Sequence, residues 1–148
     1  LFLLDLLVCC GAAEGFTEKL VDLGQNVTLQ CEMTVKDAIW FLMKPSEPPV
    51  YILRSYSSKT LVAHYGNRTF RKIFSLQYNS SLAIHNISTN ELGVYYCIRY
   101  GSAPNISRGI RLYIQNHAAG EFIYYTLYKF NIYMFLATFC KNIVYIIL

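Results

Sequence analysis

The cysteines are the residues whose type and position most directly suggest chemistry. The 148-residue chain has five: Cys9 and Cys10 lie in an apolar N-terminal run, and Cys140 lies in an apolar C-terminal one. Cys31 and Cys97 remain as one pair in the middle of the chain. A single pair suits one disulfide made in an oxidising compartment, and the alternative is two free, buried thiols.

A second chemical signal is the Asn-x-Ser/Thr motif, which in an exported protein accepts N-linked glycans at exposed positions. The chain carries it at five positions: Asn26, Asn67, Asn79, Asn86 and Asn105. Because the motif is short, any one site can stay unused. Five motifs within about 80 residues nevertheless predict at least two or three occupied sites.

Nothing in the sequence indicates catalysis, a metal or a cofactor. His64, His85 and His117 are far apart and lack the i, i+4 spacing of helical metal ligands. The chain has no nucleophile elbow and no phosphate-binding glycine run. Its net charge of +4 is not gathered into a basic stripe, so we expect no nucleic-acid partner and no enzyme.

The positioning elements are predicted to be β-strands from residue 15 to about residue 115. Short apolar runs that alternate with polar residues, separated by turn residues at even spacing, are typical of a β-sandwich. The expected strands include residues 27–31, 40–42, 50–53, 82–87, 94–98 and 109–114, with a turn at 46–49. One face of each strand is expected to be buried.

Over roughly residues 20–115 the chain resembles an immunoglobulin V-set domain. The residues that carry the resemblance are Cys31, Trp40, Leu82, Glu91, Gly93, Tyr95, Cys97 and the strand at 109–114. The phrases EPPVYILRSYSS, SSLAIHNIS and ELGVYYC are similar to single-V-domain receptors of the novel immune-type receptor group. The chain has a single Gly in the last strand and not the Phe-Gly-x-Gly of a joining segment, which argues against an antibody or T-cell-receptor chain.

The resemblance implies an all-β, two-sheet Greek-key sandwich over residues 14–116. It implies a disulfide from Cys31 to Cys97 between the sheets, with Trp40 packed against the bridge. The hydroxyl of Tyr95 is expected to bond back to upstream backbone at the corner before its strand.

Glu91 stands where the family usually has Asp. In the family this acid pairs with a base at the start of another strand, which here is either Arg71 or Lys72. The sequence does not choose between them. A pair of this kind near the surface contributes at most about 1 kcal/mol.

Two surfaces are candidates for recognition. The first is the loop end, formed by residues 34–37, 54–60 and 99–108, where Tyr56 and Tyr100 supply rigid amphipathic contact area. A glycan on Asn105 would partly mask it. Turn composition alone would produce similar loops.

The second candidate is the outer face of the sheet that contains Trp40. If Trp40, Tyr95 and Cys97 point inward, alternation turns their neighbours outward. The predicted outward cluster is Phe41, Met43, Tyr96 and Ile98, joined by Tyr51 and Tyr113. An apolar cluster open to water usually marks a protein contact, and V-set domains resembling this one use that sheet for pairing or ligand binding. The alternative is that neighbouring loops cover part of it.

The two ends of the chain have a different character. Residues 1–13 look like the apolar part and small-residue cleavage site of a signal peptide that lacks its first residues, the alternative being a buried element.

Residues 117–148 look like a stalk and a membrane span, although Lys129 and Lys141 interrupt the apolar run. An intramembrane Lys would pair with an acid on an adaptor chain, as in activating receptors of the resembled kind. A span confined to residues 130–148, or a segment that is not receptor sequence, are the alternatives. The tyrosine-motif match at residues 143–148 is interpreted as chance.

Taken together, these observations predict the ectodomain of an immune-type cell-surface receptor that binds a protein ligand without chemistry. The alternative is an adhesion or co-receptor subunit that pairs with another V domain through the outer face. The expected location is the plasma membrane with the V domain outside, or secretion if the tail is not an anchor.

Overall fold

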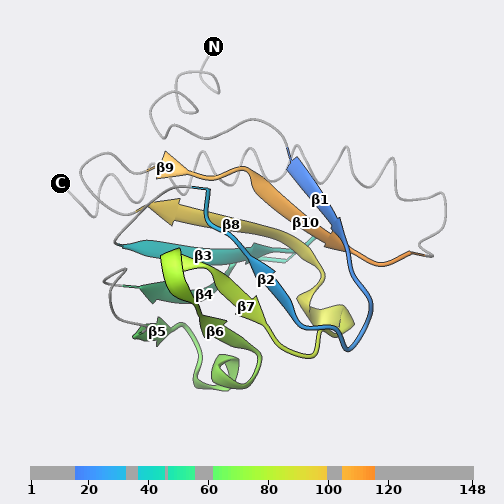
Figure 1. Cartoon of the computed structure of the whole chain (residues 1–148), viewed down its shortest axis with the longest axis horizontal. Coiled ribbons are helices and arrows are strands. Elements are labelled where there is room, and N and C mark those ends of the chain that lie inside the picture. Colours follow the sequence, from blue (N-terminus) through green and yellow to red (C-terminus); the bar gives the residue numbers. More distant parts are fainter. Residues whose placement is uncertain (1–15, 33–36, 46, 56–61, 100–104, 116–148) are drawn as a thin grey trace, which may run out of the picture.

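The chain folds into two β-sheets packed face to face in a computed structural model that describes residues 16–32, 37–45, 47–55, 62–99 and 105–115 (Figure 1). The predicted signal segment and the predicted tail lie outside these residues. The large sheet contains, in spatial order, β1 (Phe16–Leu20), β10 (Gly109–Tyr113), β8 (Gly93–Arg99), β3 (Ala38–Met43), β4 (Val50–Ser55) and β5 (Ala63–Tyr65), with β9 (Asn105–Ile106) also beside β8. The small sheet contains β2 (Val27–Leu29), β7 (Leu82–Ile84) and β6 (Phe74–Leu76).

Strand order differs from chain order, as in a Greek-key sandwich. Strand β2 pairs with β7, and β3 pairs with β8, so strands far apart in sequence are direct neighbours in both sheets. Strand β1 runs parallel to β10, and the other pairs are antiparallel. The predicted two-sheet architecture is confirmed.

Alternation along the strands builds the core between the sheets. On β3, Trp40 and Leu42 belong to the core cluster and Phe41 does not; on β8, Tyr95 and Cys97 belong to it. The inward residues of the small sheet are Val27, Leu29, Phe74, Leu76, Leu82 and Ile84. Complete burial of a Leu, Ile or Val side chain contributes about 1.5–3 kcal/mol, so this interleaved layer is the main source of stability.

Strand β4 contains a bulge that the sequence does not reveal. Leu53 lies opposite Trp40 and Tyr51 lies opposite Phe41, so Ile52 has no partner on β3. An extra residue of this kind bends a strand and breaks its alternation. Ile52 and Leu53 consequently both face the core, each with 0% exposure, while Tyr51 and Arg54 remain partly exposed.

In the part of the chain that the structure describes, three short 3-10 helices connect strands: η1 (Arg68–Lys72), η2 (Tyr78–Ser80) and η3 (Thr89–Glu91). They lie between β5 and β6, between β6 and β7, and between β7 and β8, respectively. Within the described ranges there is no helix with the length and apolar character needed to span a bilayer.

Candidate binding surfaces and the disulfide core

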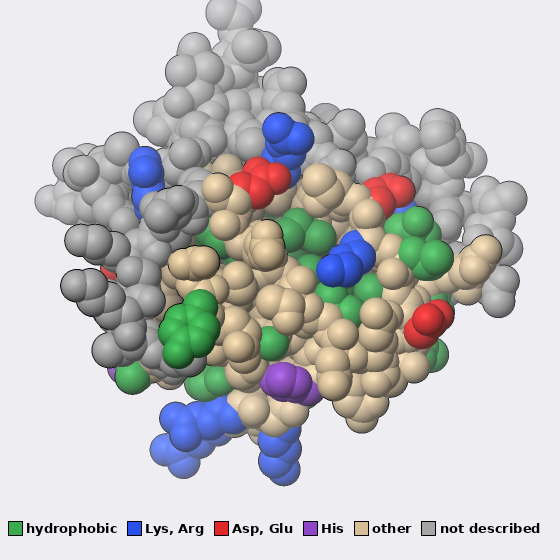
Figure 2. Space-filling view, viewed as in Figure 1, with side chains coloured by type: hydrophobic (Ala, Val, Ile, Leu, Met, Phe, Trp, Pro, Cys, Tyr) green, Lys and Arg blue, Asp and Glu red, His purple; other side chains and the backbone are tan. Residues whose placement is uncertain are grey.

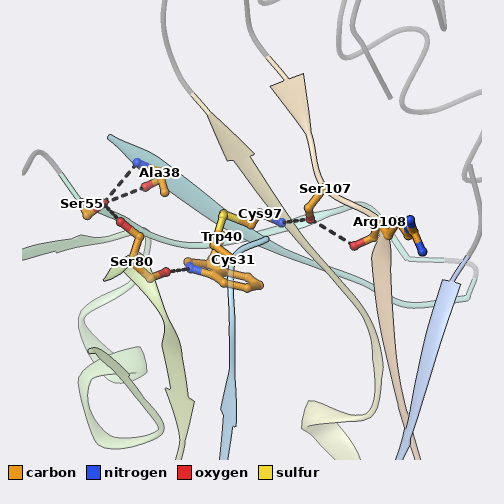
Figure 3. Close-up of a disulfide and its surroundings, with 8 residues drawn as sticks. All are labelled: Cys31, Ala38, Trp40, Ser55, Ser80, Cys97, Ser107 and Arg108. Carbon is orange, nitrogen blue, oxygen red and sulfur yellow. Dashed lines mark hydrogen bonds between the residues drawn. A yellow bond between two sulfur atoms is a disulfide. The ribbon is translucent and has the colours of Figure 1, made fainter. Parts of the chain in front are cut away.

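A disulfide joins the two sheets through Cys31, two residues after the end of β2, and Cys97 in β8 (Figure 3). The two Cα atoms are 5.7 Å apart, and the bridge spans 66 positions of sequence. The pairing implied by the resemblance is confirmed. Closing a loop of this length contributes roughly 4 kcal/mol if the bridge acts by restricting the unfolded chain.

Trp40 packs in the same layer and is tied to the opposite side of the sandwich by a hydrogen bond. Its side chain is 0% exposed, and its Nε1–H donates to the carbonyl of Ser80 at 2.7 Å (Figure 3). The hydroxyl of Ser80 lies 3.4 Å from that of Ser55, which accepts from the Ala38 amide at 3.1 Å. A buried indole needs an acceptor, and this network supplies it.

Ser107 holds the last strands against the disulfide. Its hydroxyl accepts from the backbone N–H of Cys97 at 3.0 Å and donates to the carbonyl of Arg108 (Figure 3). Its own N–H donates to the Cys97 carbonyl at 2.9 Å. Ser55, Ser80 and Ser107 could not be identified from the sequence, because their partners are distant in the chain or are backbone atoms.

The tyrosine corner predicted at Tyr95 is confirmed. Its hydroxyl donates to the carbonyl of Glu91 at 2.6 Å, and the ring is completely buried. Burial, with a smaller contribution from the Glu91 carboxylate, raises the pKa of Tyr95 well above 10.0. The phenol therefore remains a donor throughout the physiological range.

The predicted pairing of Glu91 with Arg71 or Lys72 is wrong. Glu91 as a residue is 6% exposed, and its carboxylate instead accepts a short hydrogen bond from the hydroxyl of Ser88, the N-cap residue of η3. Ser88 stands three residues earlier on the same turn, so local geometry delivers this partner without a long-range contact. Arg71 lies over the ring of Tyr65, with its Cζ 5.6 Å from the centroid.

The outer face of the large sheet carries the aromatic residues that the alternation predicts. Phe41 lies opposite Tyr96 on one side and Tyr51 on the other, and the Phe41 and Tyr51 ring centroids are 5.7 Å apart. The next row along the strands contains Ile39, Ile98 and Ile106, one each from β3, β8 and β9. Apolar groups therefore run continuously across this face.

This face is less open to water than the alternation suggests. Met43, Tyr96 and Ile98 are only 5%, 4% and 2% exposed, whereas Phe41, Tyr51 and Tyr113 are half-buried. Ile98 lies directly between Ile39 and Ile106 in the sheet. The expectation of a water-exposed cluster is wrong for Met43, Tyr96 and Ile98. Their role in binding stays a prediction.

Two ion pairs flank the outer face. Arg54 of β4 binds Asp37 through two hydrogen bonds, and Arg111 of β10 lies 3.3 Å from a carboxylate oxygen of Glu18. The guanidinium of Arg111 also lies 5.3 Å from the ring centre of Tyr113. Charged groups thus stand at both margins of the apolar rows, as at the polar rim of many interfaces.

The predicted recognition loops fall mostly outside the described residues, including Tyr56 and Tyr100. The described ends of two of them meet at the Arg54–Asp37 pair, whose side chains are 21% and 28% exposed. This link between the first and second loops was not foreseen from sequence.

The glycan acceptors occupy turns and strand ends. Asn26, Asn67, Asn79 and Asn86 are exposed, and all four lie in the segments that form or border the small sheet. Asn105 lies in β9 of the large sheet, and its side chain is outside the description. Among the described residues, no group of three His, Cys, Asp or Glu side chains is arranged to hold a metal ion.

The immunoglobulin V-set domain model matches residues 16–115, and the chain belongs to this family, which is a non-catalytic fold family. The extracellular fragment of a novel immune-type receptor 10 mutant superposes with a TM-score of 0.55 at 25% identity, covering 68% of this chain and 96% of that one.

A chicken TCR superposes with a TM-score of 0.54 at 18% identity over 66% of this chain, a likeness of fold. The matched region spans 47% of that receptor chain. A comparison with curated proteins found no match.

Proposed function

We propose that this chain provides the ectodomain of an immune-type cell-surface receptor that recognises a protein ligand and performs no catalysis. The observation that carries the proposal is the likeness to the novel immune-type receptor fragment, because the V-set domain here covers nearly the whole of that extracellular fragment. V-set domains typically bind proteins. Recognition of this kind depends on surface complementarity and needs no reactive group.

The proposed binding surface is the outer face of the large sheet together with the loop end beside it. Phe41, Tyr51 and Tyr113 present partly exposed rings there, and the two ion pairs border them. Aromatic residues are enriched in the cores of protein interfaces and charged residues in the rim. The Arg54–Asp37 pair supports the proposal further, because it fixes the bases of two loops that would have to act together.

The proposed location is the cell surface, with residues 1–13 directing export and residues 117–148 anchoring the chain. Lys129 or Lys141 would then be the residue that pairs with an acidic adaptor chain. Staining of intact cells tests this. With a starting Met, a tag after Ala13 and a second tag after Leu148, the first tag should be visible only outside and the second only after permeabilisation. Retention of both tags inside the cell contradicts the proposed location.

An adhesion or co-receptor subunit is the second candidate. It is favoured by the continuity of the apolar rows across β3, β8 and β9, because a face of this kind can bury itself against a second copy. The two candidates differ in the identity of the partner.

A fluorescent multimer of residues 14–116 separates them. Staining of a panel of cells, lost when those cells are first treated with trypsin, is expected for a protein ligand. Staining restricted to cells that display this same chain indicates pairing. Staining that survives trypsin contradicts a protein ligand.

A further inference from the structure

Four of the five glycosylation motifs gather around the small sheet. Asn26 directly precedes β2, and Asn86 follows β7 by two residues, so they lie at the same end of this antiparallel pair (Figure 1). Asn79 lies in η2, at the turn between β6 and β7, which is the opposite end of the sheet. Asn67 caps η1, which leads into β6 at the edge.

The hydrogen bonds of the Asn26 and Asn67 side chains use the amide oxygen and not Nδ2, the nitrogen to which a glycan is attached. The Oδ1 of Asn26 accepts the backbone N–H of Asn86 at 2.9 Å. The Oδ1 of Asn67 accepts both the N–H and the hydroxyl of Thr69. A glycan attaches at Nδ2 and leaves the amide oxygen in place, so both hydrogen bonds are compatible with glycosylation.

The other two asparagines occupy backbone positions that suit this residue type. Asn79 has a φ of 59° and Asn86 a φ of 51°. Asn and Asp adopt this left-handed region more readily than other side chains. Both side chains are exposed, so a glycan at either position meets solvent.

The outer face of the small sheet offers little for a protein partner to bind. Thr28, Ala83 and Ser75 form one row of outward residues across the three strands. Gln30, Gln77 and His85 lie just beyond the ends of these strands. Figure 2 shows mostly neutral polar side chains and backbone over this side of the molecule. Interface cores are depleted in such small polar residues, in contrast to the aromatic rows of the large sheet.

We infer that the small sheet is a glycan-covered face, with N-linked chains on Asn26, Asn67, Asn79 and Asn86, and that recognition is thereby confined to the large sheet and the loop end. In each attachment, a bond forms between Nδ2 and the anomeric carbon of an oligosaccharide carried on a polyprenyl pyrophosphate. The anomeric C–O bond breaks, the pyrophosphate leaves with the electron pair, and Nδ2 gives up one proton. Like the proposed function, the inference requires export of the chain.

The test is site-by-site glycopeptide mass spectrometry of the full chain, given a starting Met and expressed in mammalian secretory cells. Each of the four Asn→Asp variants should lose one glycan mass. Asp is the matched replacement because it keeps the oxygen acceptor at positions 26 and 67 and tolerates the positive φ at positions 79 and 86. Glycans at fewer than three of the four sites would overturn the inference.

Shielding of the small sheet by glycans is measured by hydroxyl-radical oxidation of the same protein before and after enzymatic removal of the glycans. Tyr78, which is 71% exposed beside Asn79, and His85, which is exposed beside Asn86, should lose their protection when the glycans are removed. Tyr113 on the large sheet is the control and should not change. Equal oxidation of Tyr78 and His85 in both states contradicts a covered face.

Failure of this inference is distinguishable from failure of the proposed function. A chain that reaches the cell surface or the medium without glycans contradicts the glycan-covered face alone. A chain that remains in the cytosol and carries no glycan contradicts both.

Discussion

Arg54 holds Asp37 in a two-point ion pair, with Nε 3.1 Å from Oδ1 and Nη2 2.9 Å from Oδ2. The two residues lie 17 positions apart, at the start of β3 and the end of β4, where two of the predicted recognition loops begin. The loops themselves lie outside the described residues, but this pair fixes the distance between their bases. A planar guanidinium is suited to this geometry, and a lysine is not.

Replacing Arg54 with Lys should therefore affect loop positioning more than stability. Because both side chains are partly exposed, we expect a loss of at most about 1 kcal/mol in the free energy of unfolding. Multimer staining of ligand-bearing cells should weaken more than this stability change explains. Arg111→Lys, which alters the other ion pair away from these loops, is the control and should leave staining less affected. Equal staining by Arg54→Lys and the unmodified domain would argue against a role for this link.

Replacing Trp40 with Phe should destabilise the domain although the ring stays apolar. The substitution leaves the buried carbonyl of Ser80 without its donor, at a cost of about 1–3 kcal/mol. The smaller ring also leaves a cavity next to the disulfide, which adds to the loss. Urea unfolding with the disulfide intact measures the change. A loss below about 0.5 kcal/mol, the range of an ordinary surface substitution, would contradict the importance assigned to the Trp40–Ser80 bond.

Tyr95 should make the domain sensitive to alkaline pH. Its pKa is raised in the folded state by burial and, to a smaller extent, by Glu91. Above pH 10 the unfolded chain therefore loses this proton while the folded chain keeps it. The free energy of unfolding must then fall as the pH rises.

Tyr95→Phe should reduce that alkaline fall, while costing about 0.5–1.5 kcal/mol at neutral pH because the bond to the Glu91 carbonyl is lost. Denaturant unfolding at a series of pH values from 7 to 11 measures both effects. Tyr65→Phe is the matched control, because this phenol also donates to a carbonyl, that of Phe74, but is less buried. This variant should reduce the alkaline fall in the free energy of unfolding less than Tyr95→Phe does. A Tyr95→Phe variant with the same alkaline slope as the unmodified domain would refute the argument.

Substitution of Glu91 should destabilise the domain, whereas substitution of Arg71 or Lys72 should not. Glu91→Ala removes the charged acceptor of the Ser88 hydroxyl, and we expect a loss of about 1.5–3 kcal/mol. Arg71→Ala and Lys72→Ala are expected to stay within about 0.5 kcal/mol of the parent. A double-mutant cycle decides the matter, since a coupling above about 0.5 kcal/mol between Glu91 and either base would restore the pairing that the structure rejects.

The disulfide, the buried Trp and the tyrosine corner were predictable because each depends on a residue type that no other side chain can replace. A lone central cysteine pair, one Trp and a Tyr two residues before the second Cys leave few alternatives, and Cys31, Cys97, Trp40 and Tyr95 all lie as expected. The partner of Glu91 was mispredicted because a local serine three residues away competes with two distant bases. Sequence spacing does not rank such competitors.

Other features left no trace in the sequence. The bulge at Ile52 falls within the run Val-Tyr-Ile-Leu, where every residue is compatible with either face. Alternation predicted which side of β3 and β8 Met43, Tyr96 and Ile98 occupy, but it cannot predict how far each side chain is buried on that side. The parallel pairing of β1 with β10 joins ends of the domain that no local pattern relates.

The most direct test of the central claim compares two single substitutions that add the same charge to opposite sides of the sandwich. Phe41→Glu places a carboxylate in the aromatic row of the large sheet, and Gln30→Glu places one on the outer face of the small sheet, at an exposed position outside every glycosylation motif. Multimers of both variants are applied to cells that bind the unmodified domain, and thermal unfolding is measured in parallel. If recognition uses the large sheet, Phe41→Glu abolishes staining with little change in melting temperature, and Gln30→Glu stains like the parent. Loss of staining with Gln30→Glu and its retention with Phe41→Glu would contradict the account.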